Sequence, residues 1–267
     1  ASKRLDHLTK ECLDAFAVRH IHNPRDRIRM RGRHVDQLPA LASEAHVIAM
    51  DQRGHGASTN AGPYTEAQHV ADLIGFLDAL TIERCDLLGH SFGGMVALRA
   101  VLDHPERFRS LVLMDTAPGP LTLFPPKVKA YLDQLVTEGG CQALLKGMRD
   151  APPNAAAQRG IDFLGEAEHW RRITVKLEQM DPAAFRDLGN YFAEREDLTE
   201  RMSELNCPVT VVVGAEDAPF IEPSKVMAEA AADAELVVIS EAGHSPQYEN
   251  APSWTDAIRA HLQGLRG

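Results

Sequence analysis

Short apolar runs with strand character alternate with segments of helical periodicity over much of the chain from about residue 45 onward. This alternation predicts an α/β fold in which a mostly parallel, doubly wound sheet carries helices on both faces, because parallel strands need long crossover connections. The strands expected from the sequence are 45–50, 85–88, 111–114, 209–213 and 235–239. The expected helices are 66–80, 95–102, 224–232 and 252–262.

A long stretch in the middle of the chain departs from this alternation. It begins with prolines, which break regular structure, at positions 118, 120, 125 and 126. From about 127 to 200 the pattern is helical, with no convincing strand. The sequence therefore predicts an α/β core made of residues 1–118 and 201–267, interrupted by a helical domain at 119–200.

The charge balance of the 267 residues is acidic, with 28 basic and 38 acidic side chains and a formal net charge of −10. Phosphate backbones and anionic lipids repel such a chain, so nucleic acids and membranes are not expected as partners. No apolar run approaches the roughly 18 residues of a membrane span, and the chain does not begin with an apolar signal-peptide core. We therefore expect a cytoplasmic protein.

The four cysteines are scattered and form no CxxC pair: Cys12, Cys85, Cys141 and Cys207. Disulfide frameworks and zinc sites both need closely spaced or recurring cysteines. We therefore expect free thiols and no metal site.

A glycine-rich hexapeptide, Gly89-His90-Ser91-Phe92-Gly93-Gly94, lies between an expected strand and an expected helix. This is the context that a G-x-S-x-G nucleophile motif requires, because a sharp strand-to-helix turn exposes the serine hydroxyl above the sheet. Glycines are needed where side chains would collide with the neighbouring backbone. The alternative is an ordinary glycine-rich turn. We interpret Ser91 as a candidate nucleophile.

A serine hydroxyl needs a base to remove its proton, and the base needs a carboxylate to orient it. Asp217 follows the expected strand 209–213, and His244 follows the expected strand 235–239. Ligands bind outside the carboxyl ends of the strands in an open parallel sheet. Ser91, Asp217 and His244 are therefore predicted to meet at one edge of the sheet, with His244 as the base and Asp217 as its acid.

The sequence resembles the α/β-hydrolase family, in particular its small, capped esterase, lactonase and dehalogenase-like members. Four segments within residues 36–264 carry the resemblance: Asp51–Ser58, Gly89–Gly94, Gly214–Asp217 and Gly243–Gln247. The chain order of serine, acid and histidine is also that of the family. The resemblance implies that 119–200 is a cap over the pocket, that Asp51–Ser58 is a structural turn, and that no organic cofactor or metal is needed.

Other residues compete for the same roles. Asp115 also ends an expected strand, where some family members place the acid, and Glu216 adjoins Asp217. Asp217 is preferred because the Gly-x-Glu-Asp turn matches the commoner position in the family. His90 is expected to be structural, since neighbouring side chains on the elbow diverge, and His55 is expected to be structural as well.

An oxyanion hole needs two donors, and only one of them is evident in the sequence. The backbone N–H of Phe92, which follows the nucleophile, is the first. The family takes the second from a His-Gly-x loop after an aliphatic run, but the corresponding stretch, 17–25, lacks both features. Pro24 has no N–H, so Asn23 is the candidate for the second donor.

Residues 1–35 are therefore atypical, and residues 1–34 carry nine basic against four acidic side chains. Three interpretations are open. The segment forms an unusual oxyanion hole, or it derives from an altered or frame-shifted stretch of coding sequence, or the protein binds ligands without catalysis. Arginines at 25, 27, 29, 31 and 33 alternate along the chain and would share one face of an extended segment. They would form an anion-binding patch or, as we expect, belong to a solvated or irregular segment.

The resemblance and the serine together predict a hydrolase that cleaves a small carboxylic ester, thioester or lactone through an acyl-enzyme. A serine nucleophile disfavours the dehalogenase and epoxide hydrolase branches of the family, which use an aspartate. Alternatives on the same three residues are a C–C bond hydrolase and a cofactor-free haloperoxidase or perhydrolase. A hydrolase-fold ligand binder without catalytic activity is the alternative outside enzymology.

Overall fold

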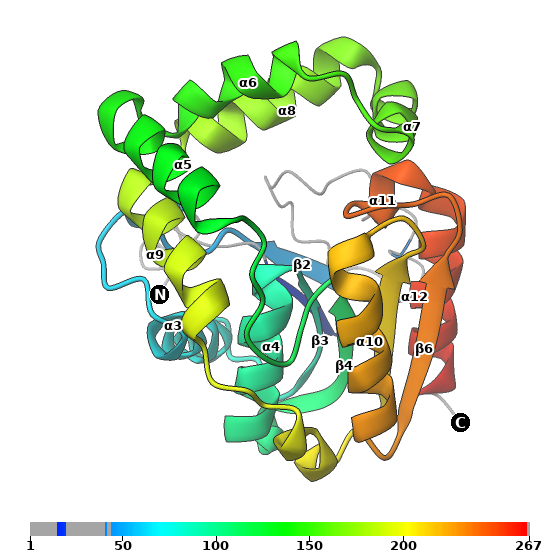
Figure 1. Ribbon diagram of the computed structural model, residues 1–267. Coiled ribbons are helices and arrows are strands. Elements are labelled where there is room, and N and C mark those ends of the chain that lie inside the picture. Colours follow the sequence, from blue (N-terminus) through cyan, green and yellow to red (C-terminus); the bar gives the residue numbers. More distant parts are fainter. Residues whose placement is uncertain (1–14, 20–40, 42–43, 266–267) are drawn as a thin grey trace.

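The computed structural model of the protein describes residues 15–19, 41 and 44–265. In this part of the chain, a six-stranded sheet has the order β2-β1-β3-β4-β5-β6 (Figure 1). The strands are β1 Ala15–Arg19, β2 His46–Met50, β3 Cys85–His90, β4 Phe108–Met114, β5 Val209–Gly214 and β6 Ala234–Ile239. Strands β3 to β6 are parallel, whereas β1 runs antiparallel to both β2 and β3. The mostly parallel sheet expected from the sequence is confirmed.

Helices lie on both faces of the sheet, and the alternation of side chains along each strand explains why. On β4, Leu111 and Leu113 belong to the core cluster on the side of α3, α4 and α10, while Val112 and Met114 belong to the cluster on the side of α12. A strand whose two faces are both buried reads as a continuous apolar run, as residues 111–114 of β4 do. The bounds are α3 Glu66–Ala79, α4 Phe92–Asp103, α10 Ala218–Ala230 and α12 Ala251–Gly264.

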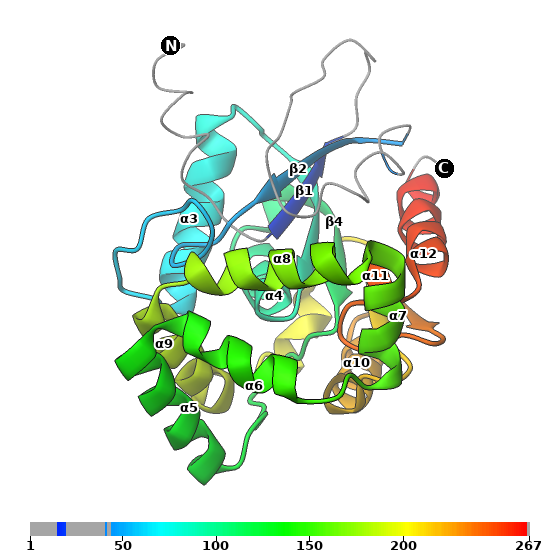
Figure 2. The same cartoon turned by 90° about the horizontal axis from the view of Figure 1, so that it is seen from above.

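Between β4 and β5 the chain leaves the core near Pro118, forms a helical insert, and returns to the core near Leu198. Its helices are α5 Pro126–Gly139, α6 Leu144–Asp150, α7 Ala155–Leu164, α8 Glu166–Glu178 and α9 Pro182–Glu194. Figures 1 and 2 show α6 and α8 crossing above the carboxyl end of the sheet, with α7 next to the short helix α11 (Pro246–Glu249). Val136, Cys141 and Leu177 give the insert a small apolar core of its own.

The two ends of the insert lie side by side where it joins the core. The Leu198 amide donates to the Pro118 carbonyl at 3.0 Å, and the Leu121 amide donates to the Phe192 carbonyl at 2.7 Å. The insert therefore leaves and re-enters the core at one place.

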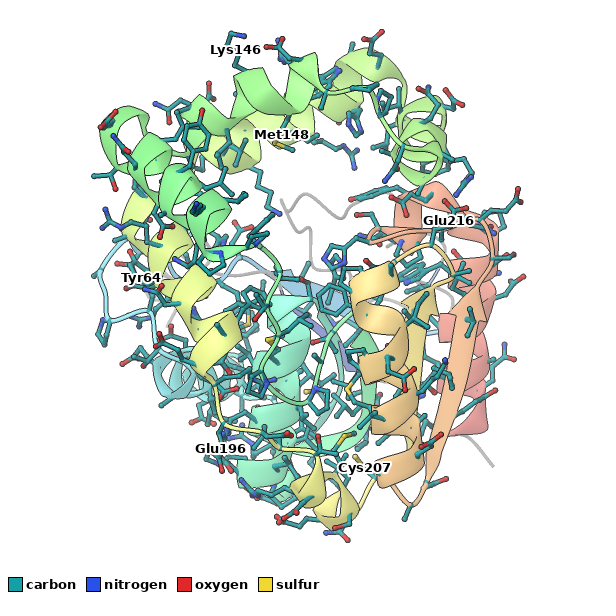
Figure 3. All side chains as sticks on the ribbon, viewed as in Figure 1. Tyr64, Lys146, Met148, Glu196, Cys207 and Glu216 are labelled. Carbon is teal, nitrogen blue, oxygen red and sulfur yellow. The ribbon has the colours of Figure 1, made fainter. Side chains whose placement is uncertain are left out.

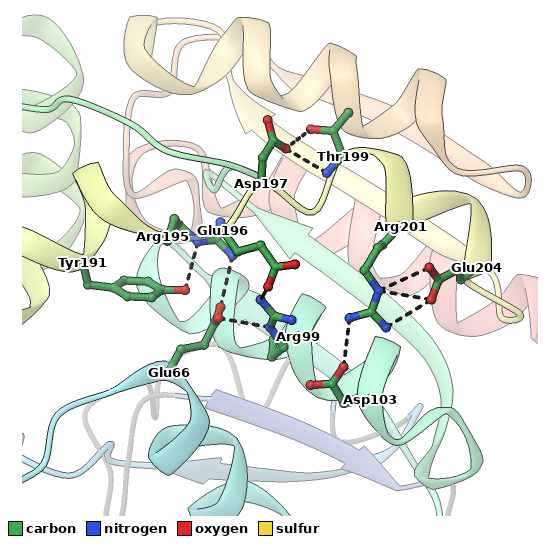
Figure 4. Close-up of polar contacts among 10 residues, drawn as sticks. All are labelled: Glu66, Arg99, Asp103, Tyr191, Arg195, Glu196, Asp197, Thr199, Arg201 and Glu204. Atoms are coloured by element: carbon green, nitrogen blue, oxygen red, sulfur yellow. Dashed lines mark hydrogen bonds and ion pairs between the residues drawn. The ribbon is translucent and has the colours of Figure 1, made fainter.

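Buried ion pairs tie the end of α9 to the core (Figure 4). The Arg195 side chain is fully buried and pairs with Glu66 at 3.1 Å, while it also donates to the Ala117 carbonyl at 2.7 Å. Glu66 accepts from Arg99 as well, at 3.1 Å, and Arg99 in turn pairs with the exposed Glu196 at 2.6 Å. Glu66 is thus a largely buried carboxylate held between two guanidinium groups.

Replacing Glu66 by glutamine should destabilise the protein by about 3–5 kcal/mol, because it leaves buried Arg195 without its counter-charge. Glu196→Gln is the matched control, since it removes a carboxylate from the same Arg99 at a side chain that is 60% exposed. The control should cost at most about 1 kcal/mol. Free energies of unfolding from urea titration measure both effects. Equal losses in the two variants would contradict the assignment.

No helix in the described part of the chain combines the length and the apolar character that crossing a bilayer requires.

Candidate active site

Ser91 occupies a sharp turn between β3 and α4. Its backbone has a φ of 54° and a ψ of −122°, a left-handed conformation that strains a residue with a side chain. A Cβ atom on Gly89 would lie 2.4 Å from the Gly93 carbonyl oxygen, and one on Gly94 would lie 2.7 Å from the Thr116 side chain. These two positions require glycine, and they let the helix start immediately after the serine.

The structure brings together the three side chains that the sequence predicts to meet. The His244 ring lies between the other two: its Nε2 is 3.0 Å from Ser91 Oγ, and its Nδ1 is 2.7 Å from Asp217 Oδ2. The buried Asp217 carboxylate accepts from Nδ1–H, which assigns the tautomer in which Nε2 is free to accept the serine proton. Serine, imidazole and carboxylate therefore form one continuous hydrogen-bonded chain.

Two aromatic rings flank the imidazole. Phe220, on the first turn of α10, stacks on the His244 ring with the centroids 5.0 Å apart. The His90 ring lies 4.9 Å from it on a tilt, and His90 Nε2 is 2.7 Å from the His244 carbonyl oxygen. His90 is thus bound to the backbone of the base, as its expected structural role requires. Phe220 was not predicted, although its position three residues after Asp217 is a usable signal.

The rival acids lie elsewhere. Asp115 is fully buried and accepts the Gly214 amide at 2.9 Å, and burial together with the nearby Asp217 carboxylate raises the pKa of its carboxyl well above the usual range. A carboxyl whose charged form is disfavoured by burial is a poor partner for a cationic imidazole. Glu216 instead pairs with Arg159 of α7 at 2.6 Å, on the side of the core that faces the insert (Figure 3).

The Asp51–Ser58 segment forms a tight turn beside the site. A Cβ atom on Gly56 would lie 2.3 Å from the Asp51 carboxylate, and Gly56 has a φ of 59°. Asp51 also accepts the Ala57 amide at 3.2 Å. Within the same turn, His55 Nδ1 lies 3.1 Å from the Arg53 carbonyl oxygen. These contacts are those of a structural turn.

One of the two candidate oxyanion donors can be placed. The Phe92 amide is the first of α4, and the first amides of a helix have no partner within it. This amide therefore lies beside Ser91 at the positive end of the helix dipole. Asn23, the other candidate, lies outside the described residues, as do Pro24, Cys12 and the arginines between 25 and 33.

Behind Phe92 lies a buried histidine that sequence reasoning did not single out. The His69 ring is 4.9 Å from the Phe92 ring, edge to face, and within the described chain neither of its nitrogens has a hydrogen-bond partner. Burial lowers the pKa of His69 to about 4, so the native imidazole is neutral at pH 7.

His69 should make the protein sensitive to mild acid. Its side chain titrates near 6.5 when unfolded and near 4 when folded, so the unfolded state binds the extra proton and stability falls as the pH drops from 6.5 to 4. Between pH 7 and 4.5 this loss amounts to about 2.5 kcal/mol. We expect urea titrations of His69→Phe to lack that part of the loss. Parallel pH profiles of unfolding free energy for the variant and the wild type would contradict this.

The three described cysteines, Cys85, Cys141 and Cys207, are free thiols. Burial raises the pKa of Cys141 and of Cys207 to about 11, so neither is a thiolate at neutral pH. They are not candidates for the nucleophile.

A second serine–histidine contact is buried in the core. His261 Nε2 is 2.8 Å from Ser110 Oγ, and His261 Nδ1 is 2.8 Å from Thr210 Oγ1. Ser110 is fully buried, and its hydroxyl donates to Asp86 at 3.0 Å. This network joins α12 to the sheet and cannot reach a substrate.

The Ser91–His244 pair opens into a cavity of about 630 Å³ between the core and the insert. The volume suits a small organic ligand. Apolar side chains from the insert line its upper part: Met148, Ile161, Leu164, Trp170, Ile173 and Leu188. Figure 3 shows Met148 on the inner side of the insert, toward the core.

Among the described residues, one cluster has the composition of a metal site, namely Asp115, Asp217 and His244. Its ligand atoms lie within 4.8 Å of one another. The contacts already described account for the cluster, because Asp217 and His244 bind each other and Asp115 holds the Gly214 amide.

A parallel sheet with a strained serine elbow, followed in the chain by an acid and a histidine at later strand ends, defines the class of the α/β-hydrolases. A sequence profile described as "Alpha/beta hydrolase family" matches residues 29–257, and the chain belongs to this family. The resemblance inferred from the motifs is thereby confirmed.

Several of the similar proteins are named as hydrolases or esterases. A 2-hydroxymuconate semialdehyde hydrolase from Pseudomonas putida is 32% identical over 227 residues, 81% of this chain and 76% of that protein. A putative carbamate hydrolase from Pseudomonas syringae pv. syringae (strain B728a) is 26% identical over 239 residues, 85% of this chain and 87% of that protein. A solved thermophilic esterase from Thermogutta terrifontis has a TM-score of 0.71 and 28% identity, with 86% of this chain and 84% of that chain covered.

Proposed function

We propose that the protein is a serine hydrolase that cleaves a small carboxylic ester, thioester or lactone. The observation that carries the proposal is the hydrogen-bonded chain from Ser91 through His244 to Asp217, at the base of a cavity that a small ligand can enter. The relation to a solved esterase supports the ester class.

In the first half of the proposed reaction, Ser91 Oγ attacks the substrate carbonyl carbon while His244 Nε2 accepts the hydroxyl proton. Asp217 keeps the imidazole in the required tautomer and stabilises its positive charge. The Phe92 N–H donates to the oxyanion that develops on the carbonyl oxygen. When the tetrahedral intermediate collapses, His244 returns the proton to the leaving alcohol, thiol or lactone oxygen, and the acyl group stays on Ser91.

In the second half, a water molecule replaces the leaving group. His244 accepts a proton from the water as it attacks the acyl carbon, and then gives a proton to Ser91 Oγ as the acid is released. The residues named and water are sufficient for both halves, so the proposal includes no cofactor and no metal. Asn23 remains the predicted second oxyanion donor.

The insert, which corresponds to the predicted domain at 119–200, is proposed to act as a cap that shapes the pocket. Two contacts hold it against the loops that carry the acid and the base. Arg159 of α7 pairs with Glu216, next to Asp217, and the Arg172 guanidinium of α8 lies 5.6 Å from the ring centroid of Tyr248, on the helix that follows His244. Cap position and triad geometry are therefore linked. A small-molecule partner and a cytoplasmic location complete the proposal.

A C–C bond hydrolase is the second candidate. It is favoured by the 32% identity to a 2-hydroxymuconate semialdehyde hydrolase. Such an enzyme would consume a vinylogous diketone much faster than a nitrophenyl ester, so the relative rates on the two substrates separate the candidates. The haloperoxidase or perhydrolase alternative would need peroxide as co-substrate and is separated in the same assay by adding it.

A fluorophosphonate probe tests the catalytic claim directly. The wild-type protein should be labelled over time, mass spectrometry should place the label on Ser91, and Ser91→Ala should remain unlabelled. Ser203→Ala is the matched control, because Ser203 lies in an exposed turn and bonds only the Glu200 carbonyl among the described contacts, at 2.8 Å. Absence of labelling together with no turnover of 4-nitrophenyl acetate would favour the non-catalytic ligand binder.

A further inference from the structure

The cavity has charged side chains at its wall as well as apolar ones. Four charged residues line it: Asp51, Arg172, Lys176 and Glu249. A charge that faces a binding cavity either has a partner within the protein or is available to a ligand. The partners of these four groups therefore indicate what charge the cavity can accept.

Three of the four charged groups have partners within the protein. Asp51 holds the Ala57 amide in the turn already described, and the Glu249 carboxylate accepts the amides of Gly243 at 2.6 Å and Ser245 at 3.2 Å.

The Arg172 Nε is 2.7 Å from Glu168. Its guanidinium also lies against the Tyr248 ring, so its charge is committed to the contact between α8 and α11.

Lys176 is the exception. Its side chain is exposed, and no carboxylate of the described chain lies within ion-pair distance of its ammonium group. Its neighbours at helical spacing on α8 and just beyond offer none either, since they are Arg172, Ile173, Gln179 and Met180. The cation one turn away, Arg172, adds to the positive potential instead of cancelling it.

No other basic group takes this place in the lining. His169 belongs to the same helix and lines the same cavity, but burial lowers the pKa of its imidazole, which keeps it neutral at pH 7. The whole chain carries a formal net charge of −10, which disfavours the approach of anions elsewhere. A positive charge in the cavity wall of an acidic protein should therefore favour anionic ligands at this place.

We propose that Lys176 is the ligand of a carboxylate subsite in the cavity, and that the substrate carries an acidic group at a distance from the carbonyl that Ser91 attacks. This inference deepens the proposed hydrolase function and rests on it. The ester or lactone end meets the triad at the base of the cavity, the apolar insert residues contact the connecting chain, and the carboxylate pairs with the ammonium on α8.

A matched pair of esters tests the subsite. Mono(4-nitrophenyl) adipate carries a terminal carboxylate, and 4-nitrophenyl adipamate replaces that carboxylate by a neutral amide of nearly the same shape. The measured quantity is the ratio of kcat/KM for the acid to kcat/KM for the amide. We expect wild type to prefer the acid, Lys176→Ala to lower the ratio up to about fivefold through KM, Lys176→Glu to lower it further, and Lys176→Arg to retain most of it.

The matched control is Lys146→Glu, which makes the same change of charge on the outer side of α6, where Lys146 pairs with Asp150 and points away from the core (Figure 3). Its ratio should equal that of the wild type. Raising the salt concentration should lower the wild-type ratio and leave that of Lys176→Ala nearly constant, because a partly exposed ion pair is screened. Equal ratios in wild type and all Lys176 variants would overturn the subsite.

The proposed function and the subsite can fail separately. If wild type hydrolyses neither ester, the hydrolase proposal fails, and calorimetric binding of the adipate dianion then decides the subsite. Tighter binding to wild type and Lys146→Glu than to Lys176→Glu would support it, and equal affinities would overturn it.

Discussion

The Ser91→Ala variant should lose about 10⁶-fold in kcat on any ester that the wild type hydrolyses. The alanine leaves His244 and Asp217 bonded to each other but removes the only oxygen within hydrogen-bond distance of His244 Nε2 among the described contacts. The remaining rate would come from the oxyanion donors and from substrate binding alone. Steady-state kinetics with a nitrophenyl ester measure the change.

Two controls separate the loss of the nucleophile from a loss of folding. The variant should unfold at the same urea concentration as the wild type, because alanine accepts the left-handed backbone at position 91 no worse than serine does. Ser203→Ala should retain full activity. A Ser91→Ala enzyme that kept more than a hundredth of the wild-type kcat would exclude Ser91 as the nucleophile.

The Asp217→Asn variant should lose about 10⁴-fold in kcat. An amide in place of the carboxylate can donate to His244 Nδ1, which favours the tautomer whose Nε2 carries the proton and cannot accept one from Ser91. The imidazolium that forms during attack also loses its counter-charge. The measurement is kcat at pH 7 together with the rate of fluorophosphonate labelling, and both should fall.

Asp115→Asn is the matched comparison. Burial disfavours the charged form of the native Asp115 carboxyl and raises its pKa. Its Oδ1 accepts a hydrogen bond from the Gly214 amide, and an asparagine carbonyl could accept the same bond. Its activity should fall by less than about tenfold, far less than that of Asp217→Asn. If instead Asp115→Asn were the more damaging change, the strand-end acid that the sequence left as a rival would be the partner of His244.

The parts of the site that local sequence determines could be predicted. The elbow depends on glycines within five residues of Ser91, and the positions of Asp217 and His244 follow from the ends of two apolar strands in a parallel sheet. Such features depend on short-range steric constraints and on a simple topological rule, so they can be predicted from the amino-acid sequence.

The parts of the structure that depend on tertiary packing could not be predicted from the sequence. Strand β1 is not among the expected strands, because it lies outside the alternating part of the chain and its partners β2 and β3 are distant in sequence. The stacking of Phe220 on His244 and the position of Lys176 in the cavity wall depend on how α10 and the insert pack. Helical periodicity fixes the existence of those helices but not their placement.

The adjoining ends of the insert have a consequence for how such enzymes diversify. Since the chain departs near Pro118 and returns near Leu198, where the two ends share a hydrogen bond, the stretch between these points is one contiguous insertion with adjoining ends, in which Arg195 must be kept as the partner of Glu66. A different set of cap helices could be inserted at these two positions without changing the order of the strands or moving Ser91. New substrate preferences could thus arise by exchanging one contiguous stretch of gene, while the chemistry underneath stays intact.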